Sequence, residues 1–295
     1  MKSLQGLGVA LITPFCKDGT IDFPSLEKLV NYNIEGGTEY LVILGTTAEN
    51  ATLNSEEKKQ VIDCILKSNN KRLPLVLGIG GNNTADIVHQ LQTTNLEDFS
   101  AILSVSPYYN KPSQEGIYQH YKKIAENSNK PIIIYNVPGR TGSNIEAATT
   151  LRLSNDCKNI IGIKEASPNF LQSTNIIKDK PSEFRVISGD DELALPIVLA
   201  GGYGVISVLG QALPHEVSQM IKLGLDKKVE EAYTIHYKLK TLFELIFAEG
   251  NPSGIKALLS VKGICKPYTR LPLTPASTNL ISKIEKELET LSIVV

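Results

Sequence analysis

The sequence predicts an α/β protein: a (β/α)8 barrel followed by a C-terminal helical region. Eight short runs rich in Val, Ile and Leu alternate with longer stretches of helical periodicity. The short runs are nearly continuously apolar, which is typical of parallel strands covered on both faces. Their starts lie roughly 20–35 residues apart, enough for one strand, one helix and two short loops in each repeat. An open, doubly wound sheet is the main alternative.

The predicted strands follow one another regularly along the chain, with helix signals between them. The strands are expected at 8–13, 40–44, 75–78, 101–105, 131–136, 160–165, 184–189 and 204–208. After the first strand, Pro24 can occupy a first helical turn, and Gly36-Gly37 is a suitable end for that helix. Asn54 and Glu57, three residues apart, form a capping pattern before the next apolar helical face.

The eighth repeat ends near residue 225, which sets the expected domain boundary. Residues 1–225 are predicted to form the barrel catalytic domain. Residues 226–295 combine Lys and Glu with apolar residues at helical spacing, and are predicted to form a C-terminal helical region. No stretch rich in Pro, Gly or Ser separates the two parts.

Composition and charge narrow the classes of partner. The chain has 295 residues, with 30 basic against 31 acidic side chains, so there is no electrostatic argument for binding nucleic acid or an anionic membrane. The four cysteines lie far apart without a CxxC pair, and the four histidines lack metal-like spacing, so no metal site is expected. Without a clear signal peptide or a long apolar run, the protein is predicted to be cytoplasmic, with a small-molecule substrate.

The strongest candidate for chemistry is Lys164. The active site of a (β/α)8 barrel lies at the carboxyl ends of its strands, and Lys164 closes the apolar run of the sixth predicted strand. Burial there disfavours the ammonium and favours the neutral amine that Schiff-base chemistry requires. The alternative is a structural ion pair with Glu165 or another carboxylate.

Hydroxyl groups and one arginine follow other strands at the same end. Tyr135, Thr46 and Tyr109 could form a proton relay near the amine, because each hydroxyl can donate and accept. Arg140 stands in a glycine-bracketed loop and has the planar fork that suits a carboxylate. A buried tyrosine with a satisfied hydroxyl and a loop-bracing arginine are the structural alternatives.

Five motifs carry a resemblance that covers essentially the whole chain, in order and at compatible spacing. They are Gly45-Thr46-Thr47-Ala48-Glu49, Pro107-Tyr108-Tyr109-Asn110-Lys111-Pro112, Tyr135-Asn136-Val137-Pro138-Gly139-Arg140-Thr141-Gly142, Gly162-Ile163-Lys164-Glu165-Ala166 and Gly204-Val205-Ile206-Ser207. Together they resemble the 4-hydroxy-tetrahydrodipicolinate synthases, also called dihydrodipicolinate synthases, of the class I pyruvate-dependent aldolase superfamily.

The resemblance implies a TIM-barrel lyase of diaminopimelate and lysine biosynthesis. It would condense pyruvate with L-aspartate 4-semialdehyde as the first committed step, without a metal or organic cofactor, as a homotetramer built from two tight dimers. Lys164 would form the Schiff base with pyruvate. Tyr135 would move protons and would be linked through Thr46 to Tyr109, which reaches across the dimer interface in this family.

The resemblance also implies substrate-binding residues. Thr47, Gly189 and the backbone at Ile206 would hold pyruvate, and Arg140 would bind the carboxylate of the semialdehyde. A pyruvate aldolase or lyase acting on a sugar acid remains the alternative enzyme. A noncatalytic relative kept as a binding or assembly protein is the alternative outside enzymes, and the intact set of catalytic residues argues against it.

Family members that lysine inhibits bind it at the dimer interface. The matching positions here are Asn50, Ala51, Ser55, Lys58, Asn82, Asp86 and Tyr108. Lys58 stands where histidine or glutamate is frequent in the family, and Asp86 where glutamate is usual. A fixed cation opposes a cationic ligand, and the shorter acid reaches its ammonium less well. Weak or absent feedback by lysine is therefore expected.

Overall fold

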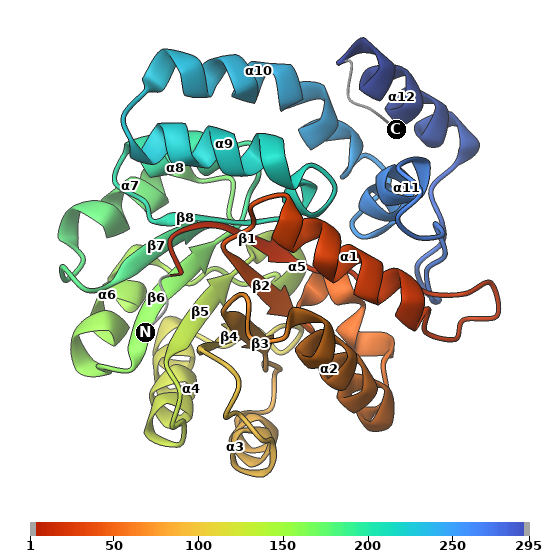
Figure 1. The fold of residues 1–295 in the computed structure, drawn as a ribbon. Coiled ribbons are helices and arrows are strands. Elements are labelled where there is room, and N and C mark those ends of the chain that lie inside the picture. Colours follow the sequence, from red (N-terminus) through yellow and green to blue (C-terminus); the bar gives the residue numbers. More distant parts are fainter. Residues whose placement is uncertain (1–3, 292–295) are drawn as a thin grey trace.

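Eight parallel strands close into a barrel in the computed structural model, which describes residues 4–291 (Figure 1). Each strand pairs with the next one in sequence, and the eighth pairs with the first. The predicted barrel is confirmed, and the open doubly wound sheet is excluded. The strands are β1 (Gly6–Ala10), β2 (Tyr40–Ile43), β3 (Leu75–Gly78), β4 (Ala101–Val105), β5 (Ile132–Asn136), β6 (Ile160–Glu165), β7 (Arg185–Ser188) and β8 (Gly204–Ser207).

The largest difference from the predicted strands concerns β1. The sequence predicts this strand at 8–13, and it lies two to three residues earlier, with Gly6 in register with Gly204 of β8. The strand ends early because the backbone N–H of Ile12 donates to the side-chain Oε1 of Gln211 at 2.9 Å instead of continuing the ladder. This partner is 199 residues away in sequence, so the apolar run alone could not indicate where pairing stops.

Helices form the outer layer and surround the barrel (Figure 1). The predicted caps are present: Asn54 and Glu57 each accept a backbone hydrogen bond from the other at 2.9 Å, and Pro24 lies in the first turn of its helix. The helices of this layer are α1 (Phe23–Glu35), α2 (Ser55–Asn69), α3 (Thr84–Thr93), α4 (Gln114–Glu126), α6 (Ala147–Asp156), α7 (Phe170–Asp179), α8 (Ala194–Leu199) and α9 (Pro214–Leu225). The short helix α5 (Pro138–Thr141) and the 3₁₀ turns η1 (Thr46–Ala48), η2 (Asn50–Thr52) and η3 (Leu209–Gln211) lie in the loops that follow β5, β2 and β8.

Two apolar cores follow from the alternation of side chains along the strands. Leu41 and Ile43 of β2 belong to the larger core between strands and helices, whereas Tyr40 and Val42 belong to a smaller core inside the barrel. The inner core also contains Tyr135. An inward-facing residue at the carboxyl end of a strand therefore points toward the mouth of the barrel.

Three further helices lie along one side of the barrel, beside α1 and α9 (Figure 1). They are α10 (Val229–Leu245), α11 (Ser253–Val261) and α12 (Thr278–Thr290), and α10 packs on α9. The Nζ of Lys28 in α1 donates to the carbonyl of Gly263 at 2.7 Å. The expected helical region is present, and its division from the barrel at residue 225 stays a prediction. Within residues 4–291, no helix combines the length and apolarity needed to cross a membrane.

Candidate active site

A cavity of about 460 Å³ opens at the carboxyl ends of β2 to β5. It brings together Thr46, Tyr135 and Arg140, which the sequence placed in one site. Gly78, Leu103 and Val105 add an apolar wall from β3 and β4, and Asn251 and Leu273 close it from the C-terminal region. Its position agrees with the expectation that chemistry gathers at this end of the barrel.

Lys164 lies inside the barrel beside this cavity. Its side chain is 5% exposed, and its Nζ lies 4.3 Å from the centroid of the Tyr135 ring. The two residues are in register on β6 and β5. None of the ion pairs within residues 4–291 includes Lys164, so the alternative of a structural ion pair with Glu165 or another carboxylate is wrong. The amine is thus buried, unpaired and next to a phenol.

The three hydroxyls of the expected relay are not joined by hydrogen bonds within one protomer. Thr46 and Tyr135 line the cavity, but Tyr109 is 89% exposed, with a backbone φ of +71°. Within the described part of the chain, no hydrogen bond joins any two of these hydroxyl groups. Tyr109 therefore projects away from the site of its own protomer.

Asn251 joins two of the expected substrate-binding residues, although the sequence does not predict it as a site residue. Its side-chain amide N–H donates to Oγ1 of Thr47 at 2.9 Å, and its backbone carbonyl accepts from the guanidinium of Arg140 at 3.1 Å. Asn251 is buried, lines the cavity and lies 204 residues from Thr47 in sequence. In the sequence, Asn251 is marked only by its place beside Pro252, just before an apolar helix. Nothing near it in the sequence indicates that Thr47 and Arg140 are its partners.

Gly189 and Ile206 complete the expected set, one beside the lysine and one on β8. A Cβ on Gly189 would lie 2.9 Å from Cε of Lys164 and 2.6 Å from Cβ of Ala166, so the lysine side chain passes where any larger residue would stand. Ile206 is fully buried in the core inside the barrel. The φ of Gly189 is not in the left-handed region, so its backbone conformation does not require glycine. Glycine is required at position 189 because a side chain would collide with Lys164 and Ala166.

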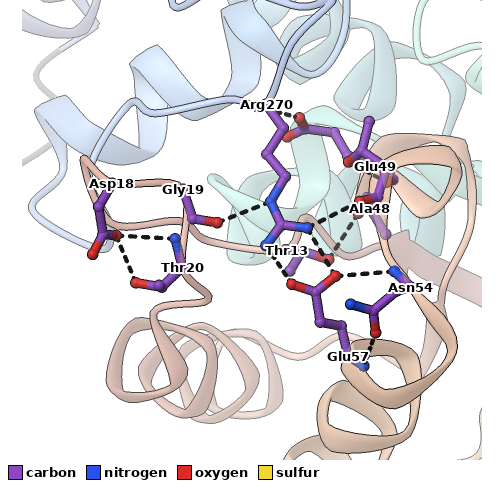
Figure 2. A network of polar contacts seen from close by, with 10 residues as sticks. Thr13, Asp18, Gly19, Thr20, Ala48, Glu49, Asn54, Glu57 and Arg270 are labelled. Atoms are coloured by element: carbon purple, nitrogen blue, oxygen red, sulfur yellow. Dashed lines mark hydrogen bonds and ion pairs between the residues drawn. The ribbon is translucent and has the colours of Figure 1, made fainter.

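The loop after β2, which carries Thr46 and Thr47, is tied to the C-terminal region by charge. Glu49 has a left-handed φ of +54° between η1 and η2, and its carboxylate accepts from Nζ of Lys256 at 2.5 Å and from the backbone N–H of Arg270 at 2.9 Å. Figure 2 shows Arg270 reaching on to Glu57, and this guanidinium lowers the pKa of the Glu57 carboxyl to about 2.

The residues expected to form a lysine-binding site are divided between two cavities and the adjoining surface. Asn50, Ala51, Lys58 and Tyr108 line the first cavity. Asn50, Ser55 and Lys58 line a second, adjoining cavity of about 780 Å³ between α2 and α3. Asn82 donates to the carbonyl of Tyr108 at 3.1 Å, while Asp86 is exposed on the first turn of α3. Lys58 is thus shared by both cavities, and burial lowers its pKa.

The fold and the site define a class of protein: a (β/α)8-barrel lyase of the class I aldolase type. A buried amine beside a phenol, at the mouth of the barrel, is the arrangement that Schiff-base chemistry needs. Among the residues that the structure describes, no cluster of three or more His, Cys, Asp or Glu could hold a metal ion.

Known proteins place the chain within that class. Residues 3–291 match the Dihydrodipicolinate synthetase family, and the chain belongs to this family. It is 55% identical over 285 residues to the 4-hydroxy-tetrahydrodipicolinate synthase of Flavobacterium psychrophilum, which covers 97% of each chain. Its fold is similar to that of the chloride-inhibited dihydrodipicolinate synthase from Acinetobacter baumannii complexed with pyruvate, with a TM-score of 0.95, 40% identity and coverage of 99% of this chain and 100% of the other. The Aquifex aeolicus dihydrodipicolinate synthase gives a TM-score of 0.94 at 38% identity, covering 98% and 99%.

Membership of the family decides between the functions that the sequence left open. The reaction is the condensation of pyruvate with L-aspartate 4-semialdehyde to 4-hydroxy-tetrahydrodipicolinate, in lysine and diaminopimelate biosynthesis. The cleavage of sugar acids and a noncatalytic binding role are set aside.

Proposed function

We propose that Lys164 is the nucleophile of this condensation and that Tyr135 moves its protons. The observation that carries the proposal is the buried, unpaired Nζ of Lys164, 4.3 Å from the centroid of the Tyr135 ring. A neutral amine attacks C2 of pyruvate, the keto oxygen leaves as water, and an imine forms. The imine nitrogen then accepts the electron pair released when the methyl group loses a proton, which gives an enamine.

The enamine carbon bonds to the aldehyde carbon of the second substrate. The amino group of that substrate then replaces the lysine nitrogen at C2, which closes the six-membered ring and frees Lys164. Tyr135 supplies and removes protons during imine formation and cyclisation, linked through Thr46 to Tyr109 of a second protomer. No metal or organic cofactor is needed, because the imine is the electron sink.

The same proposal assigns substrate binding to residues around the cavity. Thr47, Gly189 and the backbone at Ile206 hold pyruvate, while the guanidinium of Arg140 binds the carboxylate of the semialdehyde. The position of Arg140 on the cavity wall and its hydrogen bond to Asn251 support this assignment, because the bond fixes one end of a fork suited to carboxylates.

The nucleophile is tested by trapping the pyruvate imine with borohydride and mapping the modified peptide. We expect one adduct, at Lys164, that disappears together with turnover in Lys164→Ala. Lys58→Ala is the matched control, because the Lys58 amine lines the cavity and its removal should leave the adduct in place. An adduct that persists at another lysine in Lys164→Ala would refute the assignment.

A homotetramer built from two tight dimers, in the cytoplasm, belongs to the same proposal. The exposed Tyr109 and the 81% exposed Leu271 support a partner surface near the cavity mouth. If Tyr109 serves the partner's site, mixing two inactive variants, Lys164→Ala and Tyr109→Ala, should restore about a quarter of wild-type activity through mixed dimers. Sedimentation of the wild type gives the assembly, and a mixture that stays inactive after exchange of subunits would contradict a shared site.

Weak or absent inhibition by lysine is proposed from Lys58 and Asp86. Lys58 projects a cation into both cavities, where it would repel the ammonium groups of a lysine ligand. The carboxylate of Asp86 accepts a hydrogen bond from Asn83 at 2.8 Å on the exposed face of α3.

A further inference from the structure

A fully buried carboxylate lies directly behind the proposed nucleophile, on the opposite face of the sheet. Lys164 and Glu165 are consecutive in β6, so their side chains point to opposite faces, and the same holds for Tyr135 and Asn136 in β5. The register pairs Tyr135 with Lys164 and Asn136 with Glu165. The Tyr135–Lys164 pair therefore faces the barrel interior, and the Asn136–Glu165 pair, one residue further along both strands, faces the helices.

The outward pair is joined by hydrogen bonds. The side-chain amide of Asn136 donates to both carboxylate oxygens of Glu165, at 2.9 and 3.0 Å. The remaining lone pairs of Glu165 accept from the side chain of Gln172 and from the backbone N–H of Ser167, each at 2.8 Å. One carboxylate thus connects β5, the end of β6 and α7.

The network also reaches the segment after the helix that carries Arg140. Oδ1 of Asn136 accepts from the backbone N–H of Ile145 at 2.9 Å, and its amide also donates to Asn144 at 2.8 Å. Asn144 in turn donates to Gln172 at 2.8 Å. The ends of β5 and β6 and the loop beyond Arg140 are fixed to one another from outside the barrel.

Burying the Glu165 carboxylate costs desolvation free energy, so packing alone does not explain its presence. Glu165 is fully buried, burial raises its pKa, and no ion pair within residues 4–291 includes it. A buried carboxylate held by neutral donors alone costs more desolvation than an apolar side chain of similar size would. Its contacts are directional, however, and apolar packing would not fix the register of two strand ends as tightly.

We propose that Glu165 and Asn136 are positioning residues that hold β5 and β6 so that the Tyr135 ring stays against the amine of Lys164. The inference rests on the proposed roles of Lys164 and Tyr135 and deepens them. A shift of either strand end would move a group that must be placed accurately, and a misplacement of about 1 Å can cost about 100-fold in rate.

The test uses Glu165→Gln in the full-length enzyme. The new amide brings N–H groups to a place where Asn136, Gln172 and Ser167 already donate, so the network loses acceptors without losing volume. At saturating pyruvate we expect the rate of borohydride-trappable adduct formation at Lys164 to fall about 10–100-fold, with the pyruvate KM changed less than about threefold. Asn136→Ser, which removes the side-chain amide that donates to both oxygens of Glu165, carries the same expectation if Glu165→Gln does not fold.

Glu39→Gln is the matched control. This carboxylate also has a pKa raised by burial and accepts a backbone hydrogen bond, from Leu7, but it lies just before β2 at the opposite end of the barrel. It should lower the melting temperature and leave the adduct rate within about twofold of wild type. Adduct formation at the wild-type rate in folded Glu165→Gln would overturn the positioning role. A wild-type enzyme that forms no adduct at Lys164 would instead overturn the proposed function.

Discussion

Lys256→Met tests the buried ion pair that joins α11 to the loop after β2. The side chains of Lys256 and Glu49 are both fully buried, with Nζ and Oε1 2.5 Å apart. Lys256 also donates to the carbonyl of Tyr268 at 2.9 Å and lies 4.2 Å from the centroid of the Phe15 ring. Burial lowers the pKa of Lys256, and Glu49 opposes that change.

Methionine keeps most of the apolar stem and removes the charge. Within residues 4–291, the carboxylate of Glu49 then keeps the backbone N–H of Arg270 as its hydrogen-bond donor, and the Arg270 guanidinium offsets part of its charge. Removing one partner of a buried pair typically costs about 3–5 kcal/mol, because the other charge is left uncompensated. For a chain of 295 residues, an unfolding entropy of about 2.1 cal/mol/K per residue turns this cost into about 5–8 °C of melting temperature.

The assay is urea and thermal unfolding of Lys256→Met, Glu49→Gln and the double variant, followed by circular dichroism. The double variant should be more stable than Lys256→Met, because no buried charge remains. Lys240→Met is the matched control: its ion pair with Glu192 has the same 2.5 Å separation, but both side chains are close to half exposed, so the loss should not exceed about 1 kcal/mol. Equal losses for Lys256→Met and Lys240→Met would refute the argument from burial.

Three other predictions follow from the site and its surroundings. Gly189→Ala should slow adduct formation at Lys164 by forcing its side chain aside, since the new Cβ would lie 2.9 Å from Cε; trapping kinetics measure this. Burial lowers the pKa of His120 to about 4, so the unfolded chain binds the proton first and stability falls as pH drops from about 6.5 to about 4. His120→Gln should flatten that part of the unfolding profile. Wild-type enzyme should show no half-inhibition at submillimolar lysine, and Lys58→Glu should bind lysine more tightly by calorimetry.

The strands and most of their boundaries could be predicted because the sequence signals for them are local. Apolar runs, glycine pairs and a capping box act within a few residues, and seven of the predicted strands overlap the observed ones with ends that agree to within one residue. The contacts that shape the site are not local. Asn251 meets Thr47 across 204 residues, and Lys256 meets Glu49 across 207. Nothing in the composition of either segment identifies its partner before the barrel has closed.

One error, however, could have been avoided from the sequence alone. The ion pair between Lys164 and Glu165 is ruled out by the strand itself, because neighbouring residues in a strand point to opposite faces and two consecutive side chains cannot pair across one face. The same period of two applies to Tyr135 and Asn136. A polar pair of residues at the end of an apolar strand therefore predicts one group for the barrel interior and one for the layer between strands and helices. Two such pairs on adjacent strands predict both the chemical pair and the hydrogen-bonded pair behind it.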